Sequence, residues 1–259
     1  MNLYVAARSD VGMIRAGNED SFFAEANDKR GLFIVADGMG GHAAGDVASE
    51  MAVQIISREL AGITELNGDN VASRVADAVK KANSKIYERT ITEVDKQGMG
   101  TTASVLIVTG SRYLIGQVGD SRVYLLRDGK LRQLTKDHSY VQEQVDAGFL
   151  TPEQARYHPY SNVITRCVGA SDTVEPDTYH GEVRTGDVYL VASDGLTGMV
   201  DDRRLHILLM SRAEPERKVH SLIAEANGRG GLDNITAIVV QVAPDDDQNA
   251  KATDNSPHR

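Results

Sequence analysis

The sequence predicts an α+β fold in which helices lie outside antiparallel β-sheets. Four short apolar segments between residues 103 and 134 follow one another with only turn residues between them, as hairpin-linked strands do. The helical segments stand in groups before and after these strands, without the strand–helix alternation that builds a parallel sheet. We therefore expect antiparallel sheets with segregated helices.

The first third of the chain predicts two strands followed by two helices. Residues 22–23 and 32–36 are apolar, and the second run is continuous, as in a strand covered on both faces. Apolar residues then recur at helical spacing over residues 48–60, after a cap at Gly45-Asp46, and again over residues 71–86.

The middle third predicts strands over residues 103–108, 113–118, 123–126 and 131–134. Asp128-Gly129 supplies a two-residue hairpin turn between the last two. Residues 136–166 interrupt this rhythm with small helices, one over 141–147 and one at Thr151-Pro152-Glu153-Gln154. The second fits a capping box with proline at the first helical position. We expect an insertion between strands here.

The last third predicts strands over residues 188–192 and 235–242, with helices over 202–210 and 215–226 between them. No linker or repeat interrupts residues 1–243, so we expect them to form a single domain. Residues 244–259 are polar and acidic and contain no apolar residue beyond two alanines. We expect them to be a disordered tail.

Composition and charge exclude several classes of protein. The 259 residues carry a net charge of −9, which leaves no basic surplus for a nucleic-acid backbone. No segment reaches the ~20 apolar residues of a membrane span, and the first residues do not resemble a secretory signal. The lone Cys167 excludes an intramolecular disulfide and a thiolate zinc site. We expect a cytoplasmic monomer without a nucleic-acid or membrane partner.

Aspartates stand beside glycines at the ends of several apolar strands. Asp37, Asp120 and Asp194 each follow such a strand, and Asp233 precedes one. A single Asp-Gly pair is ordinary turn chemistry. Four carboxylates at the ends of core strands are different, because like charges that converge cannot all ionise without cations. Oxygen ligands without a nearby cysteine favour Mg²⁺ or Mn²⁺ over zinc.

Another charged motif precedes these strands. Arg15 lies four residues before the adjacent acids Glu19 and Asp20. It could form an exposed ion pair of little consequence. It could also bind a phosphate beside carboxylates that support a metal site. The motif by itself leaves both interpretations open.

Together these residues resemble the metal-dependent protein phosphatase family known as PP2C or PPM. Six motifs occur in the family's order and span residues 15 to 236, nearly the whole expected domain. They are Arg15 with Glu19-Asp20, Asp37-Gly38-Met39-Gly40-Gly41, Gly100-Thr101-Thr102, Gly119-Asp120-Ser121-Arg122, Ser193-Asp194-Gly195 and Asp233-Asn234-Ile235-Thr236.

The resemblance implies a four-layer α/β/β/α sandwich, two antiparallel sheets flanked by helices, with a centre of two Mn²⁺ or Mg²⁺ ions at one edge. It implies that Asp37 bridges both ions and that Asp194 and Asp233 complete the first. The backbone carbonyl of Gly38 would bind the second ion. Asp120 matches the position that, with Asp194, holds a third, looser ion in bacterial members.

The resemblance also assigns the remaining charged residues. Arg15 would bind the phosphate, and Glu19 and Asp20 would act through bound waters. Residues 136–166 match the family's flap, a segment beside the site that varies with substrate.

One position departs from the animal members of the family. Met39 stands where animal members carry a histidine proposed as a general acid. Bacterial members commonly have methionine at this position. His42 is close in sequence, but a surface or packing histidine is the favoured interpretation. A water near the third ion is the preferred proton source.

The implied reaction is hydrolysis of phosphoserine and phosphothreonine in proteins phosphorylated by serine/threonine kinases. A water bridging two ions would attack phosphorus directly, because metal coordination lowers its pKa. A cysteine-based phosphatase would need an arginine six residues after Cys167, where Thr173 stands, and the sequence contains no P-loop motif. A catalytically inactive phosphoprotein-binding module could lose its metal carboxylates, yet all of them are present.

Overall fold

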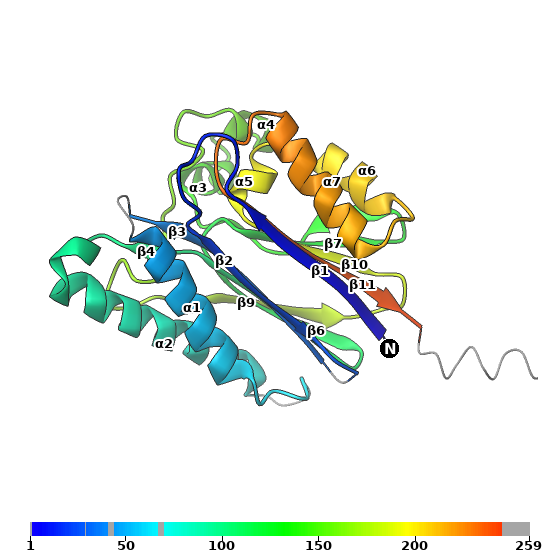
Figure 1. Ribbon diagram of the computed structural model, residues 1–259, viewed down its shortest axis with the longest axis horizontal. Coiled ribbons are helices and arrows are strands. Elements are labelled where there is room, and N and C mark those ends of the chain that lie inside the picture. Colours follow the sequence, from blue (N-terminus) through cyan, green and yellow to red (C-terminus); the bar gives the residue numbers. More distant parts are fainter. Residues whose placement is uncertain (1, 29, 41–43, 67–69, 245–259) are drawn as a thin grey trace, which may run out of the picture.

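The computed structural model describes residues 2–28, 30–40, 44–66 and 70–244. His42 and almost all of the expected tail therefore lie outside the described residues. Two antiparallel sheets face each other in the middle of the molecule (Figure 1). The first has the strand order β1 (Asn2–Asp10), β11 (Ile235–Ala243), β10 (Val188–Ala192), β7 (Arg122–Arg127) and β8 (Lys130–Gln133).

The second sheet has the strand order β2 (Asp20–Ala26), β3 (Arg30–Met39), β5 (Ala103–Thr109), β6 (Arg112–Val118) and β9 (Asp177–Glu182). The short strand β4 (Gly100–Thr101) pairs with the end of β3. Every strand pair in the described chain is antiparallel, as the hairpin-linked segments predict.

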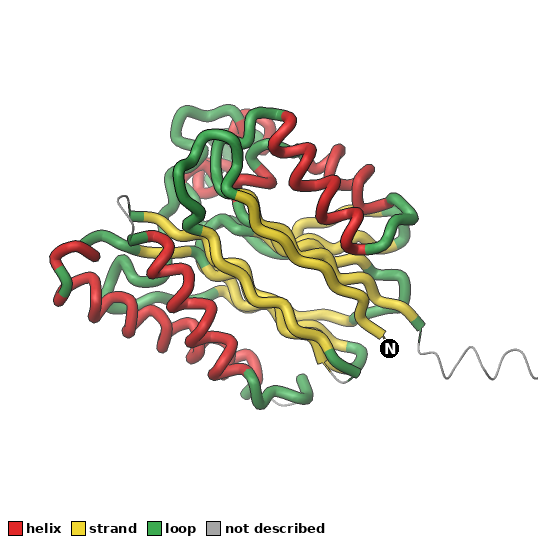
Figure 2. The backbone as a smooth tube through the Cα atoms, in the orientation of Figure 1, coloured by secondary structure: helices red, strands yellow, loops and turns green. Residues whose placement is uncertain are grey.

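Helices cover the two outer faces of the sheets (Figure 2). On the second sheet lie α1 (Gly45–Leu60) and α2 (Val71–Thr92), which a 3₁₀ turn, η1 (Val94–Lys96), follows. On the first sheet lie α5 (Asp194–Thr197), α6 (Asp202–Met210) and α7 (Pro215–Gly228). The insertion carries α3 (Tyr140–Asp146) and α4 (Pro152–Arg156). Among the described helices, none is both long enough and apolar enough to cross a membrane.

Alternating side chains of the strands build three apolar layers, which confirms the four-layer sandwich. In β3, Phe33 and Val35 point between the sheets, where Ile238 of β11 also lies. Ile34 of the same strand points outward, onto helices α1 and α2. Val239 of β11 points outward onto α7 in the same way. Period-two alternation thus lets one strand serve two apolar layers.

Local signals in the sequence predict several elements well. Asp128 and Gly129, both at positive φ, form the two-residue turn between β7 and β8. Thr151 and Gln154 form the expected capping box, with proline at the start of α4. The predicted Gly45-Asp46 cap is wrong, because Ala44 is the N-cap residue of α1 and makes no side-chain cap hydrogen bond.

The sequence interpretation misses strands β1, β4 and β9 and the short helix α5. β1 mixes apolar and polar residues without a clean alternation, and its place at the sheet edge leaves it only partly buried. β9 is an edge strand of the sequence DTYHGE, which lacks the apolar run that marks β5 or β10. Both strands form because pairing with β11 and β6 completes the sheets.

The sandwich brings one set of strand ends to a single edge. β3, β6 and β10 end there, and β2, β7 and β11 begin there, because their neighbours run antiparallel. The predicted site residues lie at these strand ends, either in the terminal residues of the strands, as Asp20, Asp37 and Gly38 do, or in the segments next to them.

Candidate metal centre

Asp20 and Asp37 face each other across the first two strands of the second sheet. They are direct partners in the β2–β3 register. One carboxylate oxygen of Asp20, Oδ2, accepts hydrogen bonds from the hydroxyls of Ser193 (2.8 Å) and Thr236 (2.6 Å), which belong to the other sheet's edge. Asp20 therefore ties the two sheets together at this edge.

The backbone of Asp37 is held by the Gly100-Thr101-Thr102 motif. The Thr102 hydroxyl accepts a hydrogen bond from the Asp37 N–H (2.9 Å). The carbonyl of Asp37 accepts from the Thr102 N–H and from the Thr101 hydroxyl, both at 2.9 Å. Gly38 follows where a Cβ would lie 2.2 Å from the carbonyl oxygen of Gly45, so only glycine fits there.

Asp194 and Asp233 come from the ends of two neighbouring strands of the first sheet. Asp194 begins α5 directly after β10, and Asp233 lies just before β11. The two segments touch, since a Cβ on Gly195 would lie 1.9 Å from the carbonyl oxygen of Asn234. The glycine after Asp194 thus permits the close approach that brings these acids together.

Asp20, Asp37, Asp120 and Asp194 form an acidic cluster. The pKa of Asp20 is raised to about 7, chiefly by burial; the hydroxyls of Thr236 and Ser193 lower it, and the charges of Asp194 and Asp233 raise it. Burial also raises the pKa of Asp37 well above its usual value, with added repulsion from Asp20, Asp194 and Asp120. The pKa values of Asp120 and Asp194 are raised for the same primary reason.

Three carboxylate oxygens of the acidic cluster have no hydrogen-bond partner among the described residues. They are the buried Oδ1 atoms of Asp20, Asp120 and Asp194. A buried polar atom without a partner costs roughly 1–3 kcal/mol, which a bound cation would offset. Because the donors are carboxylate oxygens, the cluster fits a hard divalent ion such as Mn²⁺ or Mg²⁺.

The cluster is not a preformed coordination shell. Among the described residues, no three Asp, Glu, His or Cys side chains already converge on one point. Asp37 and Asp194 perturb each other's pKa, and Asp233 bonds to Arg15. Binding ions would therefore require Asp233 to give up its bond to Arg15.

Arg15 does form an ion pair, but its partner is not one of the acids next to it in the sequence. Its Nη2 donates to Oδ2 of Asp233 at 2.7 Å, and the side chains are 52% and 35% exposed. Its charge also lowers the pKa of Glu19, although burial raises that pKa overall. Arg15 thus lies at the open rim of the acidic cluster.

Asp120 lies in the tight connection between β6 and β7, as the sequence predicts. Its side chain is only 6% exposed. Met39, at the end of β3, is partly buried. Asp120 and Met39 lie at the same edge of the second sheet. Met39 pairs there with β4, which directly precedes β5.

Asn234 supports the candidate site through hydrogen bonds, and the sequence interpretation gives it no role. Its Oδ1 accepts from the Glu19 N–H at 2.8 Å, and its Nδ2 donates to the carbonyls of Val11 and Gly17. One side chain thereby fastens the segment that carries Arg15 to the start of β11. The only sequence signal is its place beside Asp233, since its partners are more than 200 residues away.

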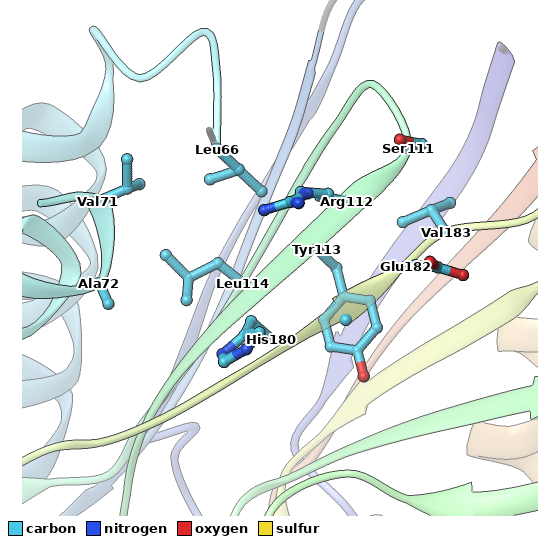
Figure 3. Close-up of a pocket in the computed structure, with 11 residues that line it drawn as sticks. Leu66, Val71, Ala72, Ser111, Arg112, Tyr113, Leu114, His180, Glu182 and Val183 are labelled. Atoms are coloured by element: carbon cyan, nitrogen blue, oxygen red, sulfur yellow. The ribbon is translucent and has the colours of Figure 1, made fainter. Parts of the chain in front are cut away.

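A cavity of about 640 Å³ lies elsewhere, at the far end of strands β6 and β9 (Figure 3). Leu66, Val71 and Leu114 form its apolar wall, while Arg112 and His180 contribute polar groups. None of the predicted site residues lines it. The acidic cluster, and not this cavity, is therefore the candidate site.

A β-sandwich with carboxylates gathered at one edge is the arrangement that the six motifs imply for a metal-dependent phosphatase. Comparison with known proteins agrees. The family described as Protein phosphatase 2C matches residues 15–225. The chain belongs to this family.

Individual relatives extend the match along most of the chain. A serine/threonine phosphatase, stp, of Listeria innocua is 40% identical over 241 residues, which cover 92% of this chain and 96% of the relative. The structure of the S. agalactiae serine/threonine phosphatase has a TM-score of 0.87 at 38% identity and covers 93% of this chain and 100% of its own. The catalytic domain of the phosphatase PstP, in complex with two manganese ions, has a TM-score of 0.83 at 40% identity, with coverage of 93% and 99%.

Proposed function

We propose that this chain is a metal-dependent protein phosphatase that hydrolyses phosphoserine and phosphothreonine. The observation that carries the proposal is the acidic cluster, whose raised pKa values and unpartnered oxygens call for cations. Membership of the protein phosphatase 2C family supports it, as do relatives named serine/threonine phosphatases and a neighbouring structure with two manganese ions.

The chain's own residues divide into ligands and supporting groups. Asp37, Asp194, Asp233 and the carbonyl of Gly38 would hold two core ions, and Asp120 together with Asp194 would hold a third. When bound, Mn²⁺ or Mg²⁺ would activate water and neutralise charge on the phosphoryl group.

The supporting groups orient the substrate and the solvent. Arg15, at the exposed rim, would bind and orient the phosphate through its planar guanidinium. Asp20 would position solvent with its unpartnered oxygen, while Ser193 and Thr236 fix its other oxygen. Glu19, the neighbour of Asp20 in the sequence, has its backbone amide bonded to Asn234 and would also position solvent.

Hydrolysis of a phosphothreonine peptide tests this function. Activity should vanish after treatment with EDTA and return with Mn²⁺. The Asp194→Asn variant should remain folded yet lose at least a hundredfold in turnover, about 2.7 kcal/mol of barrier. Asp128→Asn is the matched control, because Asp128 belongs to an Asp-Gly turn away from the cluster and should behave as wild type. Full activity without divalent ions would refute the proposal.

We further propose that residues 1–243 act as one phosphatase domain, with residues 136–166 as the flap insertion and residues 244–259 as a tail. The pairing of β1 with β11 supports this, because it joins the two ends of that range in one sheet. Limited proteolysis tests it. A stable fragment that ends within residues 136–166 would contradict it.

The expected substrates are phosphorylated proteins, products of serine/threonine kinases, and we propose that the chain meets them as a cytoplasmic monomer without nucleic-acid or membrane partners. The net charge of −9 disfavours nucleic acid. The charged residues of edge strand β9 disfavour strand pairing between copies. Light scattering of the purified chain tests the monomeric state.

A further inference from the structure

The turn between β6 and β7 determines where the Asp120 carboxylate points. Gly119 adopts a φ of 97°, and a Cβ there would lie 2.5 Å from Cγ2 of Thr102. The turn therefore packs tightly against the Gly100-Thr101-Thr102 motif. One oxygen of Asp120 is buried without a hydrogen-bond partner in the described part of the chain, so small changes of the turn would redirect it.

Two consecutive residues hold this turn at both ends. The Asp137 carboxylate accepts hydrogen bonds from Nε (3.0 Å) and Nη2 (2.7 Å) of Arg122. The N–H of His138 donates to the carbonyl of Gly119 at 2.9 Å. The Nδ1 atom of His138 lies 3.1 Å from the backbone nitrogen of Gly119. Asp120 thus lies between two residues that are each bonded to the base of the 136–166 insertion.

The hydrogen bonds determine the tautomer of His138. A backbone amide can only donate, so Nδ1 accepts the Gly119 N–H and the neutral ring carries its proton on Nε2. Nε2 lies 3.3 Å from a carboxylate oxygen of Asp177, which can accept that proton's hydrogen bond. Nη1 of Arg166 lies 3.1 Å from the same Nε2, but it can only donate and therefore does not bond to the protonated nitrogen. Arg166 donates to the other oxygen of Asp177 at 2.9 Å. The ring, 7% exposed, is therefore fixed on both sides.

We propose that His138 is a positioning residue, which holds the Gly119–Arg122 turn through its Nδ1 bond and thereby directs the Asp120 carboxylate toward an ion. This inference rests on the proposed function, because it takes Asp120 as an ion ligand. The competing role is purely structural: a buried histidine that stabilises the base of the insertion through Asp177 and Arg166.

Two amide substitutions separate these roles. The His138→Asn amide can occupy the place of Nδ1 and accept the Gly119 N–H, but it cannot reach Asp177. The His138→Gln amide can occupy the place of Nε2 and reach Asp177, but it leaves Gly119 without its acceptor. The positioning role therefore predicts that Asn substitutes for histidine, and the structural role predicts that Gln does.

The measurement is the number of Mn²⁺ ions bound, read by electron paramagnetic resonance during a titration, with turnover followed in parallel. We expect wild type and His138→Asn to bind three ions. His138→Gln should bind two, as Asp120→Ala should, and should need at least tenfold more Mn²⁺ for half-maximal turnover. His206→Leu is the matched control, because His206 bonds to a turn glycine, Gly129, outside the site.

Several results would overturn the positioning role. They are a third ion bound equally by the Asn and Gln variants, a Gln variant that resembles wild type, and a wild type that binds only two ions. In each case phosphatase activity would persist, so the proposed function would stand. A wild-type protein that hydrolyses no phosphopeptide with Mn²⁺ bound would instead refute the proposed function.

Discussion

Each acid of the candidate centre is held by contacts from a different part of the chain. Asp20 shows this most clearly, since its hydroxyl partners Ser193 and Thr236 lie 173 and 216 residues away. These bonds satisfy one carboxylate oxygen, while the other has no partner in the residues that the structure describes. A carboxylate in that state is oriented but not neutralised, which suits a residue that positions solvent beside an ion.

Motifs in the sequence predict which acids form the candidate site, because strand ends that carry Asp beside Gly are visible in the sequence. The motifs cannot predict which side chains hold these segments in place through hydrogen bonds. Asn234 and His138 hold the segments of Arg15 and Asp120 through bonds to backbone groups, and any residue type offers such groups. Only the folded chain shows which amide or carbonyl each side chain meets.

Replacing Arg15 with alanine tests its phosphate-binding role. If the guanidinium binds phosphate equally in the ground and transition states, Arg15→Ala should raise KM more than it lowers kcat. Steady-state kinetics on a phosphothreonine peptide measure both constants. Arg184→Ala is the control, because Arg184 forms an exposed ion pair with Glu182 at the far end of the sheet. An unchanged KM would leave Arg15 as a rim ion pair with Asp233.

At the scale of helices and strands, buried elements are predicted better than edge elements. β3, β5 and β10 are continuous apolar runs, and the sequence shows them directly. β1 and β9 carry polar residues because one side of each is a free sheet edge. Their strand conformation depends on pairing with a neighbour distant in the chain, which no local pattern encodes.

The tail offers a test at this scale. Strand β11 ends at Ala243, whose partner in β1 is Asn2, so a chain cut after Ala243 keeps the complete β1–β11 pair. We expect such a truncation to leave the melting temperature and the turnover unchanged. Removing β11 as well should abolish folding, because it supplies buried residues to two apolar layers. A loss of several degrees on cutting after Ala243 would show that residues 244–259 pack on the domain.

For the whole molecule, closing two sheets over one apolar layer gathers the strand ends, and with them the acids, at one edge. The resemblance of the six motifs predicts this edge, whereas the apolar pattern alone predicts only antiparallel sheets and outer helices. Binding metal ions requires ionised carboxylates, but the raised pKa values mean that ionising the cluster destabilises the folded chain. The function of the site is therefore opposed to the stability of the fold.

This opposition predicts how stability depends on pH when divalent ions are removed. Asp20 has a folded pKa of about 7 against 3.8 unfolded, so the folded state binds its proton more tightly. Its stabilising contribution is present at low pH and is lost as pH rises from roughly 4 to 7. Asp37, Asp120 and Asp194 shift in the same direction. The pKa of Glu19 is raised as well, and the lowered pKa of His138 acts oppositely, so one group stands against five.

Thermal melting in EDTA should therefore give a higher melting temperature at pH 5 than at pH 8. Excess Mn²⁺ should raise the melting temperature more at pH 8, where the ions do not compete with protons. The Asp194→Asn variant should show a weaker pH dependence, because one repelling carboxylate is gone. A melting temperature in EDTA that rises steadily from pH 5 to pH 8 would mean that ionising these carboxylates does not destabilise the folded chain.

The most direct test of the metal centre is anomalous scattering from a crystal grown with Mn²⁺, recorded at the manganese absorption edge. We expect two strong peaks within bonding distance, about 2.0–2.3 Å, of Asp37, with Asp194 and Asp233 on the first ion and the Gly38 carbonyl on the second. A weaker third peak should lie between Asp120 and Asp194. Strong peaks elsewhere, with none beside Asp37, would contradict the assignment of these aspartates as the metal ligands of a phosphatase.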